Sequence, residues 1–210
     1  MPHLLHLDSS ADLATSRSRA ITAAFAQVWT ARGDDFTVTH RDLHRDPLPH
    51  FATNEQHWPA ADRLPGAQVP ADQDALTAAI HAELLAADVL LVGAPLYNYT
   101  VPSTLKVWLD HVHIPGALAG AGTQPLAGRP AVVVSSRGAT YDAGTETEGW
   151  DHGVPVLKIV LGNSLGMDVH VVQTSATLAD RLPELAELKD RGAAEFEAAQ
   201  AAARELAATL

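Results

Sequence analysis

Residues 94–99, Ala-Pro-Leu-Tyr-Asn-Tyr, place two aromatic rings, an amide side chain and free backbone groups within one short segment. They follow the apolar run 88–93 and precede an amphipathic stretch that contains Leu105, Trp108 and Leu109. That order predicts a strand, a loop and a helix. In an open α/β sheet, the loop at the carboxyl end of a strand is where ligands bind. We therefore expect this loop to bind a flat heteroaromatic ring, with a flavin as the first candidate.

A second polar segment follows His3–Asp8, the first predicted strand. It places Ser10 at the strand end and Ser16, Arg17 and Ser18 at the start of a predicted helix. Hydroxyl groups, free amides and the positive end of the helix dipole then converge where a phosphate can bind. A serine that only caps the helix is the simpler alternative, but three hydroxyls and an arginine favour a phosphate. Neither G-x-G-x-x-G nor G-x-x-x-x-G-K-[ST] follows this strand, so a ligand with one phosphate, such as FMN, fits better than a dinucleotide.

A third polar segment, residues 134–141, comes directly after another predicted strand. Gly138 allows a tight turn, and Ser136 with the nearby amides can bond the polar edge of a ring. Alone, this segment is equally compatible with an ordinary exit from a strand. If the three strands concerned are neighbours, however, their loops meet at one crevice and combine phosphate donors, an aromatic platform and donors for a ring edge.

Strand-like and helix-like patterns alternate along the chain, which predicts an α/β fold with a mainly parallel sheet. By analogy, we expect a flavodoxin-like, doubly wound, five-stranded parallel sheet with helices on both faces, in a single domain over residues 1–210. The proline-rich segment 44–70 is either a surface excursion or a flap over the site or a partner subunit. The predicted strands are 3–8, 36–43, 89–93, 130–135 and 168–173, and the predicted helices are about 17–31, 71–86, 103–112, 154–165 and 182–208.

Composition narrows the class of protein further. The chain has no cysteine, so thiol redox chemistry is excluded and any electron transfer needs a bound cofactor. A formal net charge of −11 argues against broad binding of nucleic acid. No apolar run approaches the roughly 20 residues that span a bilayer, and the first residues lack the pattern of a signal peptide. We therefore expect a cytoplasmic protein that contacts neither nucleic acid nor membrane.

Two other patterns predict no site. Residues 162–166 match G-x-S-x-G, but a predicted helix precedes them and a strand follows, which is the reverse of a hydrolase nucleophile turn. The eleven histidines include His3 and His6 on the first strand and His40 and His44 farther along. None comes with a carboxylate and a second histidine at a convincing ligand spacing, so we predict no metal.

At these segments the chain resembles the FMN-dependent NADH-azoreductases, a family of flavodoxin-like NAD(P)H:quinone oxidoreductases. The similarity includes the A-P-L-Y-N-Y loop, the serines of the first turn (Ser9, Ser10, Ser16 and Ser18), the S-T-L-K run at 103–106 and the S-R-G turn after the fourth strand. It implies a homodimer that binds FMN near the subunit interface. It also implies that NADH or NADPH supplies two electrons, which a quinone or azo compound then accepts in a ping-pong sequence.

The resemblance also assigns roles to residues by matching position. Tyr141 stands where the family often has a histidine, and it is the candidate catalytic hydrogen-bond donor. Ala139 replaces a second glycine, and residues 115–129 and 162–166 depart from the family pattern, which leaves substrate choice open. A specialised biosynthetic flavin reductase and a non-enzymatic electron carrier are therefore kept as alternatives. The implied cofactor-binding residues are, for the phosphate and ribityl end, Ser10, Ser16, Arg17 and Ser18; for the isoalloxazine, Leu96, Tyr97, Asn98 and Tyr99; and for its pyrimidine side, Ser136, Arg137, Gly138 and Ala139.

Overall fold

The computed structural model describes residues 1–120 and 124–210 of the 210-residue chain. Within this part, five parallel strands form one sheet in the order β2-β1-β3-β4-β5. This is the strand order of a flavodoxin-like, doubly wound fold, and it makes β1, β3 and β4 neighbours. The predicted fold class is confirmed. The strands are β1 (His3–Asp8), β2 (Thr37–Asp42), β3 (Val89–Pro95), β4 (Pro130–Ser136) and β5 (Asp168–Thr174).

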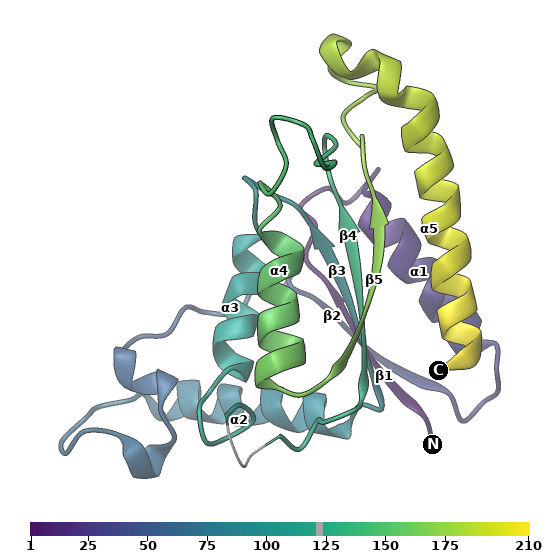
Figure 1. The fold of residues 1–210 in the computed structure, drawn as a ribbon. Helices are drawn as coiled ribbons and strands as arrows, with labels where there is room; N and C mark the ends of the chain where they lie inside the picture. Colours follow the sequence, from purple (N-terminus) through teal and green to yellow (C-terminus); the bar gives the residue numbers. More distant parts are fainter. Residues whose placement is uncertain (121–123) are drawn as a thin grey trace.

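Helices cover both faces of the sheet (Figure 1). On one face lie α1 (Arg17–Thr30) and α5 (Lys189–Thr209); on the other lie α2 (Ala71–Ala86), α3 (Ser103–Val112) and α4 (Gly153–Leu157). Two predicted helices differ from the structure in type rather than place. The helix predicted over 154–165 is α-helical only at its start and continues as a π-helix over Lys158–Ser164. The helix predicted from residue 182 begins as a 3-10 helix, Pro183–Leu188, before α5.

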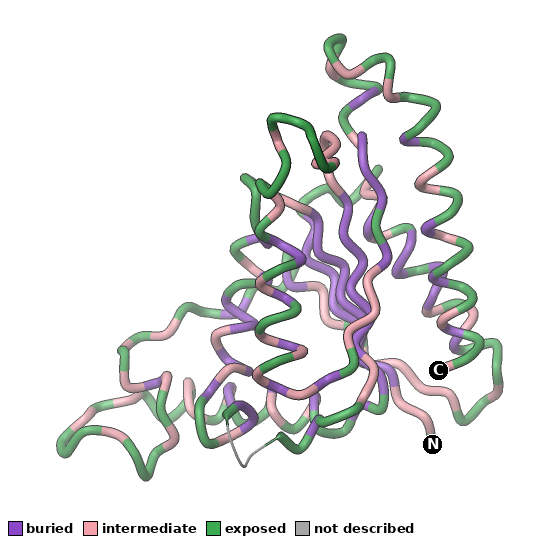
Figure 2. The backbone as a smooth tube through the Cα atoms, viewed as in Figure 1, coloured by how far each residue is buried: buried purple, intermediate pink, exposed green. Residues whose placement is uncertain are grey.

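The core has two halves, one on each side of the sheet, because successive strand residues point to opposite faces. Leu4 and Leu91 pack towards α1 and α5, whereas Leu5 and Leu90 pack towards α2, α3 and α4. The strands β3 and β4 are buried on both faces (Figure 2), which explains why both are nearly continuous apolar runs in the sequence. The sheet therefore holds the carboxyl ends of its central strands rigidly at one edge.

The segment 44–70 projects from the body of the molecule and contains two short 3-10 helices, Asn54–His57 and Ala60–Asp62 (Figure 1). Its first part is anchored on α3 by His111, whose Nε2 donates to the carbonyl of Pro49 at 3.3 Å. The Thr77 hydroxyl donates to Nδ1 of the same ring at 2.8 Å. Burial lowers the pKa of His111 below its usual value, so the neutral ring holds this anchor.

Among the described residues, no helix combines the length and the apolar composition that crossing a membrane requires. Of the small-residue segment 115–129, residues 121–123 lie outside the described part of the chain.

Candidate functional site

A cavity of about 640 Å³ lies at the carboxyl ends of the central strands. Its volume is within the range of small-molecule and cofactor sites, and its position is where ligands bind in doubly wound sheets. The three loops predicted to converge do meet there, after β1, β3 and β4, and a fourth loop after β5 joins them. Of the predicted site residues, those lining the cavity are Ser10, Ser16, Arg17, Leu96, Tyr97, Ser136 and Gly138.

The serine-rich turn and the start of α1 form one end of this cavity. Ser16 is the N-cap of α1, and its hydroxyl accepts a hydrogen bond from the amide of Arg19 at 3.3 Å. The Ser16 and Ser18 hydroxyl oxygens are 3.1 Å apart. Ser10 Oγ accepts from the amide of Asp12 at 3.2 Å, which fixes the turn itself. Hydroxyl groups at the positive end of a 14-residue helix suit an anion such as a phosphate.

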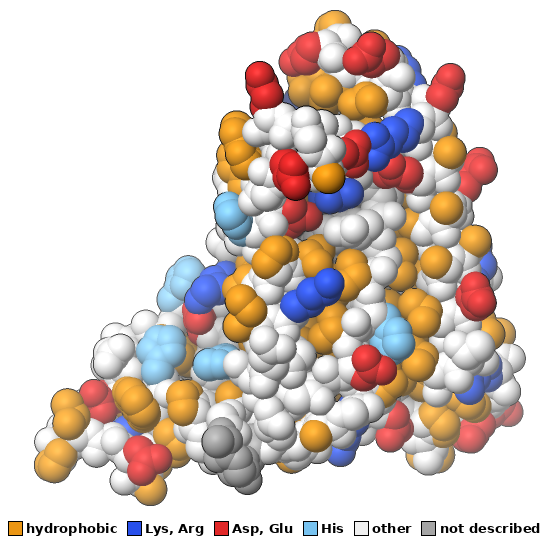
Figure 3. Space-filling model, viewed as in Figure 1, with side chains coloured by type: hydrophobic (Ala, Val, Ile, Leu, Met, Phe, Trp, Pro, Cys, Tyr) orange, Lys and Arg blue, Asp and Glu red, His pale blue; other side chains and the backbone are white. Residues whose placement is uncertain are grey.

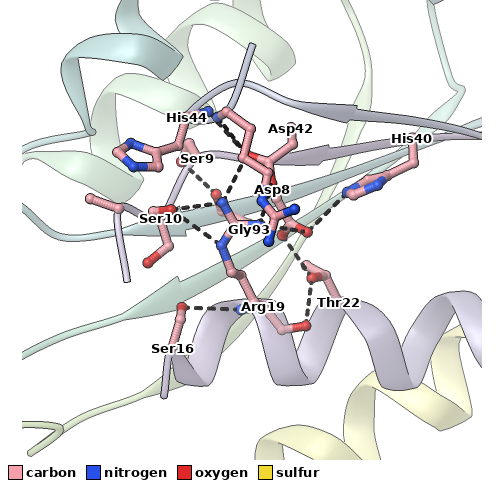
Figure 4. Close-up of polar contacts among 12 residues, drawn as sticks. Asp8, Ser9, Ser10, Ser16, Arg19, Thr22, His40, Asp42, His44 and Gly93 are labelled. Atoms are coloured by element: carbon pink, nitrogen blue, oxygen red, sulfur yellow. Dashed lines mark hydrogen bonds and ion pairs between the residues drawn. The ribbon is translucent and has the colours of Figure 1, made fainter. Parts of the chain in front are cut away.

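The two arginines of this turn have different roles. Although Arg17 lines the cavity, its guanidinium donates to the carbonyl oxygens of Ser175 and Gly192, at 3.3 and 2.6 Å. Arg19 instead holds the serine turn, because its Nε and Nη2 donate to the carbonyl of Ser10 at 3.2 and 2.7 Å. Figure 4 shows Arg19 between Ser10 and Asp42.

Asp42 completes this arrangement from β2. Two hydrogen bonds of 2.8 Å join its carboxylate to Arg19, and this pairing lowers the pKa of Asp42 to about 2. Asp42 is the register partner of Asp8. It holds the Arg19 guanidinium, which in turn holds the serine-rich turn. No local pattern in the sequence predicted this link, because Arg19 lies in α1 and Asp42 in β2, and the two residues meet only in the folded sheet.

Tyr97 links the loop after β3 to the serine turn. Its phenol oxygen is 3.2 Å from Ser10 Oγ and accepts from the amide of Ala11 at 3.1 Å. Beyond it the chain reverses in a tight turn, with hydrogen bonds between the backbones of Tyr97 and Thr100 in both directions, at 2.9 and 3.1 Å. The aromatic loop after β3 and the serine-rich turn after β1 are therefore joined by hydrogen bonds.

The two central residues of that turn, Asn98 and Tyr99, have positive φ angles of 48° and 68°. Asn tolerates this conformation, but a tyrosine there is strained, at a cost of about 1–3 kcal/mol. Neither residue is among those that line the cavity. Tyr99 is instead held by Trp150, whose ring meets its own edge-to-face at 5.5 Å, and by the amide of His152, which donates to its carbonyl at 2.9 Å.

Arg137, in the loop that follows β4, contacts side chains from two other segments. Its Nη2 donates to Ser175 Oγ at 2.7 Å and its Nη1 lies 3.5 Å from Asp151, while its Nε is buried without a hydrogen-bond partner among the described residues. The Tyr141 ring lies 5.6 Å from the Arg137 guanidinium. Burial raises the pKa of the Tyr141 phenol above its usual value, so the phenol keeps its proton at neutral pH. Neither Arg137 nor Ala139 nor Tyr141 is part of the cavity lining.

The loop after β5 contributes Thr177, Leu178, Asp180 and Arg181, which the sequence analysis did not select. Leu178 covers the S-R-G turn closely: a Cβ on Gly138 would lie 2.7 Å from Leu178 Cδ1. The fold topology could have predicted this loop, because the strand that follows β4 in a flavodoxin-like sheet ends at the same edge as the other strands. The Leu178 side chain therefore packs directly against Gly138 from the neighbouring loop.

Taken together, the sheet order and the cavity define a flavodoxin-like α/β protein with a cavity at the carboxyl ends of its central strands. The comparisons agree with this class. Residues 2–206 match the model of the family described as having a flavodoxin-like fold, and the chain belongs to that family. A protein of Kineococcus radiotolerans named FMN-dependent NADH:quinone oxidoreductase is 85% identical over 210 residues, 100% of each chain.

A protein of the same name from Streptomyces coelicolor is 41% identical over 191 residues, which cover 90% of this chain and 86% of that protein. Among solved structures, an azoreductase from Bacillus anthracis superimposes with a TM-score of 0.81 at 18% identity, covering 100% of both chains. Another from the same species, in complex with FMN, has a TM-score of 0.75 at 18% identity and covers 98% of this chain and 99% of that one. The family resemblance drawn from the sequence is confirmed by the sequence relatives, and the structural likeness confirms the fold.

Proposed function

We propose that the protein is an FMN-dependent NAD(P)H oxidoreductase that reduces quinones, azo compounds or both by two electrons. The observation that carries this proposal is that three segments line one cavity: the serine-rich start of α1, the Tyr97 loop and the Ser136–Gly138 turn. The names of the 85% and 41% identical relatives support the same activity.

The residues of the site fit FMN by their chemistry. Hydroxyls at the N-terminus of α1 suit its phosphate, and the exposed ring of Tyr97 offers an aromatic surface beside that end. The Nε of Arg137, in the turn after β4, is a buried hydrogen-bond donor without a partner among the described residues. We assign the phosphate and ribityl end to Ser10, Ser16, Arg17 and Ser18, the isoalloxazine to Leu96, Tyr97, Asn98 and Tyr99, and its pyrimidine side to Ser136, Arg137, Gly138 and Ala139.

Bound FMN would supply the redox chemistry, taking a hydride equivalent from NADH or NADPH and passing it to the acceptor. The protein residues orient the ring, hold the phosphate and keep donors near the ring edge. Tyr141, with its raised pKa, would donate a hydrogen bond there and would not exchange its proton near pH 7. Nicotinamide and acceptor would alternate at one face of the ring, which gives ping-pong kinetics.

Anaerobic stopped-flow measurement on the FMN-loaded protein tests this proposal. NADH or NADPH should bleach the flavin absorption, and a later addition of benzoquinone or an azo dye should restore it. Bleaching without turnover of either acceptor would favour a specialised flavin reductase. Failure of both nicotinamides to bleach the flavin would leave only an electron carrier and would refute the proposed enzyme.

A Tyr97→Ala variant tests the assignment of the aromatic platform. Removing the ring also removes the phenol that bonds Ser10 and Ala11, so FMN affinity should fall by about tenfold or more. Tyr97→Phe is the matched comparison, because it keeps the aromatic ring and loses only the phenol oxygen that contacts Ser10 and Ala11, so it should retain FMN better than Tyr97→Ala. If the two variants retain FMN equally well, the assignment of Tyr97 is wrong.

We also propose that the protein acts as a cytoplasmic homodimer. Large hydrophobic side chains are exposed on the projecting segment 44–70, with Trp58 at 44% and Leu64 at 69%, and Figure 3 shows hydrophobic side chains over this projection. Such a surface is typical of subunit contacts. Light scattering on the purified protein should give a mass near 44 kDa, about twice the 22.2 kDa of one chain.

A further inference from the structure

Three potential metal ligands meet beside the carboxyl end of β1. His6 and Asp8 lie two residues apart on β1 and so share one face of the strand. The parallel pairing of β1 with β2 places His40 directly opposite His6. His6 Nε2 is 3.3 Å from Asp8 Oδ2, and His40 Nε2 is 3.1 Å from the same oxygen. Strand register, rather than spacing in the sequence, assembles this group, which is why the histidines gave no metal prediction.

The two carboxylate–imidazole separations match those between neighbouring ligands in a coordination shell. Zn²⁺ binds imidazole nitrogen and carboxylate oxygen at about 2.0–2.1 Å, so neighbouring ligand atoms of a tetrahedral site lie about 3.3 Å apart. All three ligand atoms of the group lie within 4.8 Å of one another. The His6 and His40 rings are 4.4 Å apart between centroids and tilted by 37°, so small rotations of the rings can aim both nitrogens at one point.

The group also contains an unsatisfied donor or acceptor. His6 is 94% buried, with 6% of its surface exposed, and its Nε2 makes no well-aligned hydrogen bond among the described residues, although Asp8 Oδ2 lies 3.3 Å away. Buried polar atoms in folded proteins nearly always have partners, so an orphan of this kind calls for one. The orphan nitrogen faces the same carboxylate oxygen that His40 contacts, and a shared cation would satisfy all three.

The surroundings of Asp8 orient its carboxylate for such a role. Thr22 donates to Oδ1 at 2.9 Å, which leaves Oδ2 facing the histidines. Gly93 makes room for the carboxylate, because a Cβ there would lie 2.7 Å from Oδ1. Figure 4 shows His40 pointing towards Asp8 from the neighbouring strand. An oriented outer partner of this kind is typical of metal-binding carboxylates.

The local charge is also compatible with a cation. Arg19 Nη1 lies 3.6 Å from Asp8 Oδ2, but Asp42 neutralises that guanidinium through two hydrogen bonds. Arg45 Nε also lies 3.5 Å from Asp42 Oδ2, so the two carboxylates and the two arginines cancel and the group carries no net charge when the histidines are neutral. The His40 side chain is 46% exposed on the edge strand β2, which gives a cation a route from solvent.

We propose that His6, Asp8 and His40 form a binding site for one divalent transition-metal ion, with Zn²⁺ as the best match. Two imidazoles and one carboxylate favour Zn²⁺, Co²⁺ or Ni²⁺ over Mg²⁺ or Ca²⁺, which prefer oxygen ligands. None of the three residues lines the large cavity, so the site is separate from the ring-binding region. A bound ion joins the edge strand β2 to the end of β1, directly before the serine turn, and stabilises that turn.

Calorimetric titration of the full-length, FMN-loaded protein with ZnCl₂ tests the proposal. A second readout is the visible absorption of bound Co²⁺ at wavelengths longer than the flavin bands. We expect one Zn²⁺ per chain, and His40→Gln should weaken binding by about tenfold or more. Because His40 is half-exposed, this variant should keep its fold, which circular dichroism checks.

The matched control is His170→Gln. His170 Nε2 lies 3.3 Å from Asp168 Oδ2 and is likewise buried without a hydrogen-bond partner, but no third ligand joins this pair among the described residues. The control should bind Zn²⁺ as the unmodified protein does. Absence of saturable binding at one ion per chain, or equal affinity in the His40→Gln and unmodified proteins, would overturn the proposal and leave the cluster as a histidine–carboxylate network only.

Discussion

Gly93 is a position where a single added methyl group should disturb the native structure. It lies in β3 beside Asp8, and an added Cβ would come within 2.7 Å of Asp8 Oδ1 and 3.3 Å of Thr22 Cγ2. The carboxylate cannot easily retreat, because Thr22, His40 and Arg19 hold it and it is 95% buried, with 5% of its surface exposed. Gly93→Ala should therefore destabilise the native state.

The expected size follows from two opposing effects. Overpacking a buried site costs about 1–3 kcal/mol, and weakening a hydrogen bond to a buried charge adds about 1 kcal/mol. Loss of glycine's freedom in the unfolded chain offsets about 0.4–1 kcal/mol. We expect a net loss of about 2 kcal/mol, which in a chain of this size lowers Tm by roughly 4–8 °C.

Urea unfolding of Gly93→Ala and of a control, Gly162→Ala, measures this effect. A Cβ on Gly162 would meet Val169 at an ordinary 3.4 Å, so that variant should be neutral or slightly more stable. Repeating Gly93→Ala in an Asp8→Ala background isolates the clash, and the cost should there drop below about 0.5 kcal/mol. Equal costs in both backgrounds would refute the argument that the Asp8 carboxylate fills the space beside Gly93.

Three further predictions concern the turn, the anchored loop and the candidate donor. Ser16→Ala removes the N-cap of α1 and should cost about 1 kcal/mol of stability together with FMN affinity; retention of both would contradict the role of Ser16. Burial lowers the pKa of His111 below 6.5, so its stabilising effect is complete above pH 6.5 and is lost as the pH falls through the lower folded value. Unfolding at pH 7.5 and pH 5 should therefore differ more in the unmodified protein than in His111→Asn, and identical differences would exclude this source. Tyr141→Phe should slow acceptor reduction by about tenfold or more without moving the pH profile near 7, since the phenol keeps its proton there.

The sequence predicted the sheet well because burial on both faces leaves a strong local pattern. The runs Val89–Val92 and Ala131–Val134 are apolar throughout, and the structure places strands there within one or two residues of the prediction. The π-helix over Lys158–Ser164 escaped prediction because its apolar spacing is close to that of an α-helix. Local pattern thus located the elements better than it defined their type.

Contacts that depend on register or on side-chain direction could not be read from the chain. Arg17 and Arg19 stand two residues apart, yet one bonds carbonyls near α5 and the other holds Ser10 and Asp42. His6 and His40 are brought together only by the pairing of β1 with β2. The loop after β5 has no recognisable motif, so its sequence did not predict that the fold brings it to the cavity beside the other three loops.

The central claim is that the serine turn at α1 holds the phosphate of FMN while the neighbouring loops hold its ring. Fluorescence titration of the flavin-free protein with FMN and with riboflavin, which lacks the phosphate, tests it most directly. We predict one FMN per chain and binding of riboflavin weaker by about 100-fold or more, because the charge-assisted hydrogen bonds are lost. Equal affinity for the two flavins, or no saturable binding of FMN, would contradict the account.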